Sequence, residues 1–228
     1  AANYVTIEEL TIDGDYFGTH SLAAGGNLVF VDSSYVTVQN VRIVNFRRVA
    51  IMAYNPSHYV TPAQTFTNFI ADGVEVYGPS DYVDGTGPSG ILVADVNNSE
   101  MRNCYIENIG LYGYEWKNDC NFNVITNCTA VKAYNAFYYG GDLPAGSRCV
   151  KQSTISDCTV VDSPDPLWLG RADNNTVTNL VIRTTATGPT SPYGVSIRDS
   201  DNNTLRNIVM VNRKSYACDI QDGSLGNS

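Results

Sequence analysis

An internal repeat constrains this sequence more than any other feature. Eight segments share the pattern apolar, any, Asn-like, apolar, any, apolar, and they cover residues 6–12, 37–43, 70–76, 100–106, 124–130, 154–160, 176–182 and 204–210. The two apolar positions that follow the polar residue alternate as in a β-strand, where side chains two residues apart face the same side. Each unit is therefore predicted to hold short strands, with a bend at the polar residue.

The spacing of the units selects the architecture. Successive polar positions lie 22 to 33 residues apart, which excludes a heptad or a fixed-length helical repeat but suits a coil with one elastic loop per turn. That loop is predicted to follow the third apolar position and to precede a second recurring strand, as at 28–32, 91–95, 167–170 and 194–198. Coils stacked about 4.8 Å apart pair each strand with its copy above and below.

The polar column also predicts a side-chain ladder. Five of its eight members are Asn, which at a bend can hydrogen-bond from turn to turn, as in other in-register stacks. We therefore expect residues 1–228 to form one all-β domain, a parallel β-helix of about eight turns with an Asn ladder.

Two units, at 175–182 and 203–210, read Asn-x-Thr-Val/Leu-x-Asn-apolar-x-apolar. They resemble the repeat of the pectate-lyase-like superfamily of right-handed β-helices, and the resemblance covers essentially the whole chain. That superfamily includes polysaccharide lyases, polygalacturonases, alginate epimerases and phage tailspikes. The resemblance implies a carbohydrate groove with walls of long loops, on the outer face of strands near 28–32, 51–54, 91–95, 112–117, 136–140, 167–171, 194–198 and 217–220.

Charge and hydropathy exclude other partners. The net charge is −9 with only 14 Lys and Arg residues, none clustered, which argues against nucleic acid. No stretch approaches the roughly 18 consecutive apolar residues of a membrane span. The chain opens and stops within β-helix turns, so we expect a fragment or a module of a larger assembly. The tailspike resemblance implies a homotrimer, and an extracellular or virion-surface location.

Five side chains are expected to point outward from the groove strands, namely Glu115, Lys117, Trp168, Arg171 and Arg198. Glu115, Asp142 and Asp165 are predicted to share one groove across three turns. Two carboxylates at roughly 5–9 Å suit glycoside hydrolysis, whereas a lyase needs a base and a cation or metal, for which Arg171 or Lys117 are candidates. The alternative is an ordinary scatter of solvated side chains.

Aromatic residues give a second set of candidates, because Tyr and Trp offer a flat apolar face with a polar tip. The set comprises Tyr112, Tyr114, Tyr138, Tyr139, Trp168 and Tyr193, about half of which are expected to point inward. Tyr112, Tyr139, Trp168 and Arg198 are the predicted substrate-binding residues. The alternative for Trp168 is that it caps an edge of the core.

Signatures of the better-known enzymes are missing. The sequence has neither an Asp-Asp pair with a downstream Gly-His-Gly nor an Asp-Pro-His-Glu stretch. His20 and His58 are predicted to be surface residues, and no cofactor is expected, although the Asp-rich turns 81–85 and 199–203 can hold Ca²⁺.

Five of the six cysteines fall into two groups. Cys104, Cys128 and Cys158 occupy one apolar column and are predicted to pack as small buried hydrophobes. Cys120 and Cys149 can form a disulfide in an oxidising compartment, and Cys218 is left over.

The leading hypothesis is a β-helix of phage tailspike or surface depolymerase type that binds, and in one version cleaves, a bacterial polysaccharide. A secreted polysaccharide lyase, hydrolase or epimerase is the second hypothesis. A non-catalytic adhesin, fibre or surface subunit is the third.

Overall fold

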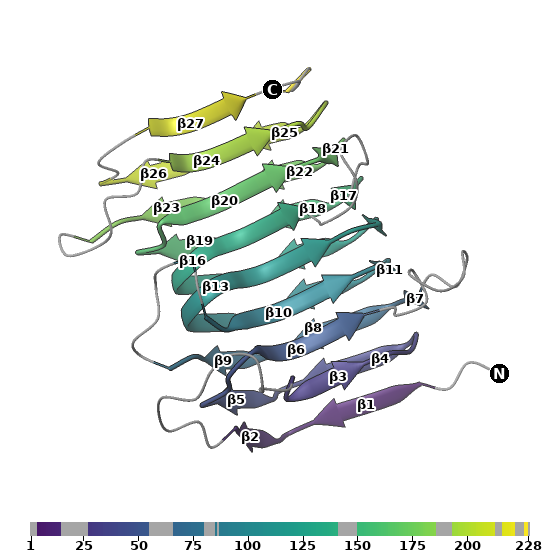
Figure 1. The fold of residues 1–228 in the computed structure, drawn as a ribbon. Coiled ribbons are helices and arrows are strands. Elements are labelled where there is room, and N and C mark those ends of the chain that lie inside the picture. Colours follow the sequence, from purple (N-terminus) through teal and green to yellow (C-terminus); the bar gives the residue numbers. More distant parts are fainter. Residues whose placement is uncertain are drawn as a thin grey trace.

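The structure, a computed structural model, describes residues 4–14, 27–54, 66–79, 85, 87–140, 150–185, 193–212, 216–221 and 226–227. Within these residues the regular elements are β-strands, and the strands pair in parallel. Successive turns lie side by side along one axis, from the first strand near the N-terminus to the last near the C-terminus (Figure 1). The predicted all-β, parallel β-helix is confirmed.

The strands form three stacks. Stack 1 contains β1 (Val5–Glu8), β4 (Val36–Gln39), β8 (Phe69–Asp72), β12 (Glu100–Arg102), β15 (Val124–Thr126), β18 (Thr154–Ser156), β22 (Thr176–Thr178) and β25 (Thr204–Arg206). Stack 2 contains β2 (Thr11–Asp13), β5 (Arg42–Val44), β9 (Glu75–Tyr77), β13 (Tyr105–Lys117), β16 (Thr129–Gly140), β19 (Thr159–Val161), β23 (Val181–Arg183) and β26 (Val209–Val211). Stack 3 contains β3 (Val29–Val31), β6 (Val49–Tyr54), β10 (Ser89–Ala94), the second halves of β13 and β16, β20 (Asp165–Gly170), β24 (Tyr193–Arg198) and β27 (Tyr216–Gln221).

Five shorter strands lie at corners between stack 3 and stack 1 of the next turn. β7 (Phe66–Thr67) pairs with β11 (Val96–Asn97), and β14 (Cys120–Asn121) is followed by β17 (Val150–Lys151) and β21 (Ala172–Asp173) in a separate small sheet.

The apolar columns of the repeat fill the interior. In the first column Val38, Ala71, Met101, Ile125, Ile155 and Val177 are buried, and the terminal members Ile7 and Leu205 are half-buried. Removing these side chains from water contributes about 25 cal/mol per Å² of apolar surface, which makes the columns the main source of stability.

The polar column lies at a corner where the backbone turns through the left-handed region. All eight members have a φ between 51° and 62°, namely Glu9, Asn40, Gly73, Asn103, Asn127, Asp157, Asn179 and Asn207. Asn, Asp and Gly tolerate this conformation better than other residues, which explains why seven of the eight are of these types.

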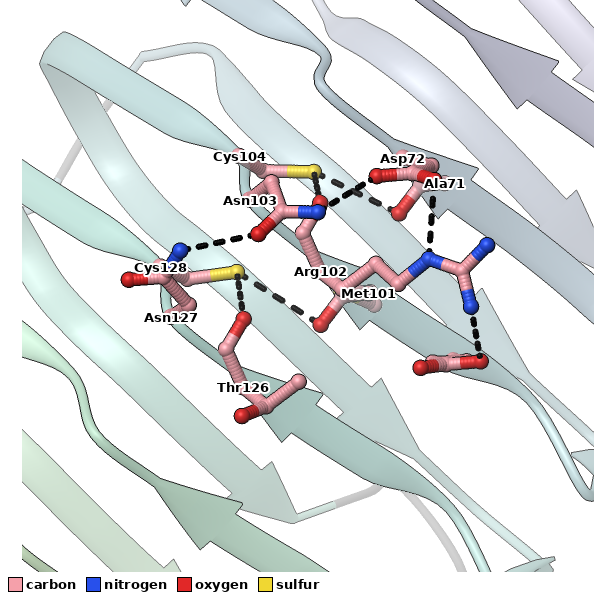
Figure 2. Close-up of polar contacts among 10 residues, drawn as sticks. Ala71, Asp72, Met101, Arg102, Asn103, Cys104, Thr126, Asn127 and Cys128 are labelled. Atoms are coloured by element: carbon pink, nitrogen blue, oxygen red, sulfur yellow. Dashed lines mark hydrogen bonds and ion pairs between the residues drawn. The ribbon is translucent and has the colours of Figure 1, made fainter.

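Side chains at this corner bond from turn to turn on the surface (Figure 2). Asn103 Nδ2 donates to Asp72 Oδ1 at 2.8 Å, and Asn127 Nδ2 donates to Asn103 Oδ1 at 2.8 Å. Asn179 bonds to Asp157 in the same way at 2.8 Å, and Asn207 to Asn179 at 3.0 Å.

A second series of polar side chains, which the sequence analysis did not identify, runs through the interior. Ser99, Asn123, Ser153, Asn175 and Asn203 are each at most 1% exposed. The backbone amide of each residue donates to the side chain of the next member, for example Ser153 N to Asn175 Oδ1 at 2.9 Å. Buried backbone groups at this corner are thereby satisfied without water.

Two strands differ from the rest because they pass from stack 2 into stack 3 without a loop. β13 and β16 bend at left-handed residues, Asn108 with a φ of 58° and Lys132 with a φ of 50°. The prediction that the elastic loop always precedes the second strand was wrong. In these two turns one continuous strand joins the stack 2 segment to the stack 3 segment.

The cysteine column is buried as predicted. Cys104 and Cys128 donate to the carbonyl oxygens of Arg102 and Thr126, at 3.1 and 3.3 Å (Figure 2). Burial raises the pKa of the Cys128 thiol. Cys120 is a free buried thiol rather than half of the suggested disulfide, and Cys149 lies outside the described residues.

Candidate binding groove

The outer face of stack 3 carries one continuous row of side chains, because the strands pair in register. Leu92 lies beside Glu115, Glu115 beside Tyr138, and the row continues through Trp168, Ser196 and Asp219. The flanking residues Tyr114 and Trp116 face the core and are fully buried. The predicted outward orientation of Glu115 and Trp168 is therefore correct.

A hollow of about 580 Å³ lies over β6, β10 and β13. It is lined by Arg48, Val49, Met52, Tyr54, Gly87, Ser89, Leu92, Ala94, Leu111, Tyr112, Glu115, Lys117 and Asn118. Its lining thus combines apolar side chains with a few charged groups, as small-molecule sites commonly do.

Glu115 is the carboxylate among these described lining residues, and it is only 1% exposed. Lys117, two residues further along β13, places its Nζ 4.0 Å from Glu115 Oε1. A buried carboxylate is costly unless a cation or hydrogen bonds stabilise it. The Glu115–Lys117 pair therefore places opposite charges together on the floor of the hollow.

Asn118, which the sequence analysis missed, also lines the hollow. Its Nδ2 donates to Asp95 Oδ2 at 3.2 Å, and both side chains are buried. Its Oδ1 is buried and has no hydrogen-bond partner among the described residues. A buried acceptor of this kind suits a ligand that brings a hydroxyl or amide donor.

Aromatic side chains and a guanidinium continue the groove across four strands. The rings of Tyr112 and Tyr138 lie 4.2 Å apart, and Tyr138 and Trp168 stack with centroids 6.4 Å apart. The Arg198 guanidinium lies over Trp168, 4.3 Å from the ring centroid, with Nη2 3.8 Å from Asp219 Oδ2. Tyr112, Tyr138, Trp168 and Arg198 form what we call the aromatic row.

A second hollow of about 220 Å³ adjoins the aromatic row. It is lined by Tyr138, Gly140, Trp168, Gly170, Arg171, Arg198 and Asp199. The two glycines explain how the rings fit. A Cβ on Gly140 would lie 2.5 Å from Tyr138 Oη, and one on Gly170 would lie 2.6 Å from Trp168 Nε1. The rings can lean along their own strands only because these positions lack side chains.

The prediction that Tyr139 binds substrate was wrong. Tyr139 is fully buried and packs on Trp116 with ring centroids 4.9 Å apart, so the outward tyrosine of this strand is Tyr138. Tyr114 also points inward, and its hydroxyl donates to the Cys104 carbonyl oxygen at 2.9 Å. Burial raises the pKa of both phenols well above the usual value.

The predicted acids are not assembled into a pair by the described residues. Asp165 begins β20 and aligns through Asn135 with Tyr112, so it lies two strands and three residues away from Glu115. Strand geometry puts their Cα atoms about 14 Å apart. Arg171 occupies a left-handed corner with a φ of 57° beside the second hollow. Asp142, His20 and His58 lie outside the described residues, as does the side chain of Tyr193.

In the described part of the chain no group of three or more His, Cys, Asp or Glu side chains is arranged to hold an ion. Most of turn 81–85 lies outside that part. In turn 199–203, Ser200 and Asn203 are buried, and Ser200 Oγ accepts from Ala172 N at 2.9 Å.

The three stacks define a parallel β-helix with two separate hollows on the outer face of stack 3. The chain belongs to the family with a right-handed β-helix region, whose profile matches residues 26–140 and 89–228. Among curated proteins no sequence matches this chain. Over the described residues no helix is long and apolar enough to cross a membrane.

Two solved structures are similar in part. One is a protein of Parabacteroides merdae ATCC 43184, provisionally described as a glycosyl hydrolase, with 14% identity, a TM-score of 0.34, and coverage of 84% of this chain and 76% of that one. The other is the catalytic domain of a GH87 α-1,3-glucanase in complex with tetrasaccharides, with 10% identity, a TM-score of 0.33, and coverage of 96% and 54%. Neither likeness bears on the substrate of this chain.

Proposed function

We propose that this chain binds a bacterial surface polysaccharide along the stack 3 groove, as a β-helix of phage tailspike or surface depolymerase type. The observation that carries the proposal is the aromatic row, which crosses β13, β16, β20 and β24 and whose members line both hollows. Aromatic rings pack against the apolar faces of sugars. An extended polymer matches a binding surface that is extended along the axis.

Buried polar atoms along the same surface support the proposal. Besides Asn118 Oδ1, the Oδ1 of Asn135 and the Oγ of Ser196 are buried and have no hydrogen-bond partner among the described residues. Both residues belong to stack 3, next to members of the aromatic row in register. Sugar hydroxyl groups can donate to and accept from such atoms.

Binding is tested with a panel of purified bacterial capsular and O-antigen polysaccharides. We expect at least one to bind the wild-type chain, and Tyr138→Ala with Trp168→Ala to weaken that binding at least roughly tenfold, as aromatic anchors in other interfaces do. Tyr4→Ala, which removes a tyrosine that is 77% exposed near the N-terminus, is the control. Equal binding by the groove variant and the control would contradict the proposal.

Cleavage is a second candidate function, favoured by the buried Glu115–Lys117 pair on the floor of the larger hollow. Glu115 can act as a base or acid, and Lys117 can neutralise a developing negative charge. Chain length after incubation, followed by size-exclusion chromatography, tests this function. Shortening that stops in Glu115→Gln while binding persists would support it. If the double variant Glu115→Gln with Asp165→Asn shortens the polysaccharide as much as the wild type does, neither acid takes part in cleavage.

The setting follows from the proposed partner. Capsular and O-antigen polysaccharides lie outside the cell, so we propose an extracellular or virion-surface location. A homotrimer, or a place in a larger assembly, is proposed from the tailspike resemblance. Light scattering of the purified chain measures its oligomeric mass.

A further inference from the structure

A second cluster of aromatic and charged side chains lies on the outer face of stack 2. It consists of Arg42 on β5, Glu75 and Tyr77 on β9, and Tyr105 and Glu107 on β13, which we call the stack 2 patch. Strand register places Glu75 beside Tyr105 and Tyr77 beside Glu107. The intervening Ile43, Val76 and Ile106 are buried, so the five patch residues face outward together.

Contacts within the patch hold the two rings in place. Tyr77 Oη donates to Glu75 Oε2 at 3.2 Å, and Tyr105 Oη donates to Glu107 Oε2 at 2.9 Å. The ring centroids of the two tyrosines are 5.6 Å apart. The Arg42 guanidinium lies over Tyr77, 4.8 Å from its centroid, and completes a row across three strands.

A hollow of about 290 Å³ opens beside the patch, lined by Asn40, Val41, Arg42, Gly73 and Glu75. Gly73 stands where most turns carry Asn or Asp, so this corner has no side chain of its own. Two features favour glycine at this position. The φ of Gly73 is +62°, and a Cβ there would lie only 2.8 Å from Asn40 Oδ1. Arg42 and Glu75 line the hollow with side chains that are 56% and 49% exposed, at a separation of 4.0 Å.

The combination of groups selects a class of ligand. Flat rings next to carboxylate acceptors suit a sugar residue, whose apolar face packs on tyrosine and whose hydroxyls donate to Glu. Two carboxylates outnumber the single guanidinium, so acidic sugars are repelled. Burial, together with Glu107, raises the pKa of Tyr105 to about 12, so its hydroxyl stays a donor at neutral pH.

We propose that the stack 2 patch is a second sugar-binding site that takes neutral, hydroxyl-rich glycan residues. It goes beyond the proposed function, because it lies on another face and does not require the groove to bind anything. β13 carries members of both sites, Tyr105 and Glu107 near its start and Tyr112 and Glu115 near its end. A long glycan held at both sites gains avidity over one held at either.

Affinity electrophoresis of the full chain tests the patch, in native gels containing soluble β-glucan, galactomannan or starch. Three variants are compared with wild type: Tyr77→Ala with Tyr105→Ala, Glu75→Gln with Glu107→Gln, and the groove variant Tyr138→Ala with Trp168→Ala. Circular dichroism melting confirms that each variant is folded. Should the tyrosine variant fail to fold, the glutamine variant, which keeps both rings and the shape of both side chains, replaces it.

We expect at least one of these polysaccharides to retard the wild type and the groove variant alike. The patch variants should bind it at least roughly fivefold more weakly, in line with the loss of aromatic contacts or charge-assisted hydrogen bonds. The inference is overturned by full retardation of the patch variants, by loss of all retardation in the groove variant, or by no retardation of wild type. None of these results decides the proposed function, which is judged with the bacterial polysaccharide panel.

Discussion

Asn175 Nδ2 lies 3.1 Å from Asn203 Oδ1 on the following turn, and both side chains are buried. Asn175 also donates to the Val150 carbonyl oxygen at 3.1 Å and accepts from Ser153 N at 2.9 Å. Asn175→Ala should therefore lower the free energy of unfolding by about 3 kcal/mol, because several buried groups lose their partners. Urea denaturation measures the change.

The matched control is Asn179→Gly at the exposed corner. It removes hydrogen bonds to Asp157 and Asn207 but keeps the left-handed backbone, with a φ of 54°. Solvent can replace the lost partners, so the expected cost is about 1 kcal/mol. If Asn175→Ala and Asn179→Gly lower the free energy of unfolding equally, burial does not make the interior hydrogen bonds more stabilising than those at the exposed corner.

Acid stability should depend on Asp72. Burial alone would raise its pKa, but hydrogen bonds from Asn103 and Arg102 outweigh burial and hold the pKa below 3.8. A carboxyl with a lowered folded-state pKa contributes stability above its unfolded pKa and loses it as pH falls through the folded value. The melting temperature of wild type should thus fall more steeply than that of Asp72→Asn below about pH 5. Parallel melting curves would contradict this.

Thiol reactivity should separate the cysteines. Burial raises the pKa of Cys120 to about 12, and Cys104, Cys128 and Cys158 are also buried, whereas Cys218 is exposed. In a Cys149→Ser background, one thiol should react with an aromatic disulfide reagent at pH 8, and four more after unfolding. Cys218→Ser is the control. If a second thiol of the folded protein also reacts rapidly with the reagent, the buried packing of Cys104, Cys128 and Cys158 is contradicted.

The same pKa shift predicts alkaline destabilisation. The unfolded chain ionises Cys120 near its usual pKa of 9.0, while the folded chain keeps it protonated until about pH 12. Stability from this group is complete below pH 9 and is lost as pH rises toward 12. The melting temperature of Cys120→Ala should therefore depend less on pH than that of wild type in this interval.

Tryptophan fluorescence should report occupation of the groove. The chain has two tryptophans, of which Trp116 is fully buried and Trp168 is half-buried in the aromatic row. Acrylamide should quench Trp168 preferentially, and a bound polysaccharide should reduce that quenching roughly twofold by covering the ring. In Trp168→Phe the polysaccharide should no longer reduce acrylamide quenching. If it still does, the ligand binds away from Trp168.

Much of the architecture could be predicted from the sequence, because a repeat fixes the fold when each unit must bury its apolar column against a neighbour. The stack 3 strands near 28–32, 91–95, 167–170 and 194–198 could be predicted for the same reason. It is harder to predict which side chains of a strand face outward where polar and apolar residues do not alternate. In Ala136–Gly140 aromatic and small residues follow one another, so the pattern does not decide between Tyr138 and Tyr139, and the prediction that Tyr139 binds substrate was wrong.

The burial of several Asn side chains could not be predicted, for a different reason. Asn175 and Asn203 are polar, so hydropathy assigns them to an exposed turn, yet their hydrogen bonds close within the core. The contribution of Asn118 depends on Asp95, which lies 23 residues earlier and meets it only through the strand register. Interactions that arise between turns of unequal length cannot be recognised from local composition.

The turn between the corners at Asp157 and Asn179 spans only 22 residues, yet it completes its hydrogen bonds to both neighbours. Duplicating or deleting such a unit would lengthen or shorten the binding surface in discrete increments of about 4.8 Å. The number of sugar residues that one molecule can span is then a heritable quantity set by repeat number. Selection could adjust it without redesigning any contact.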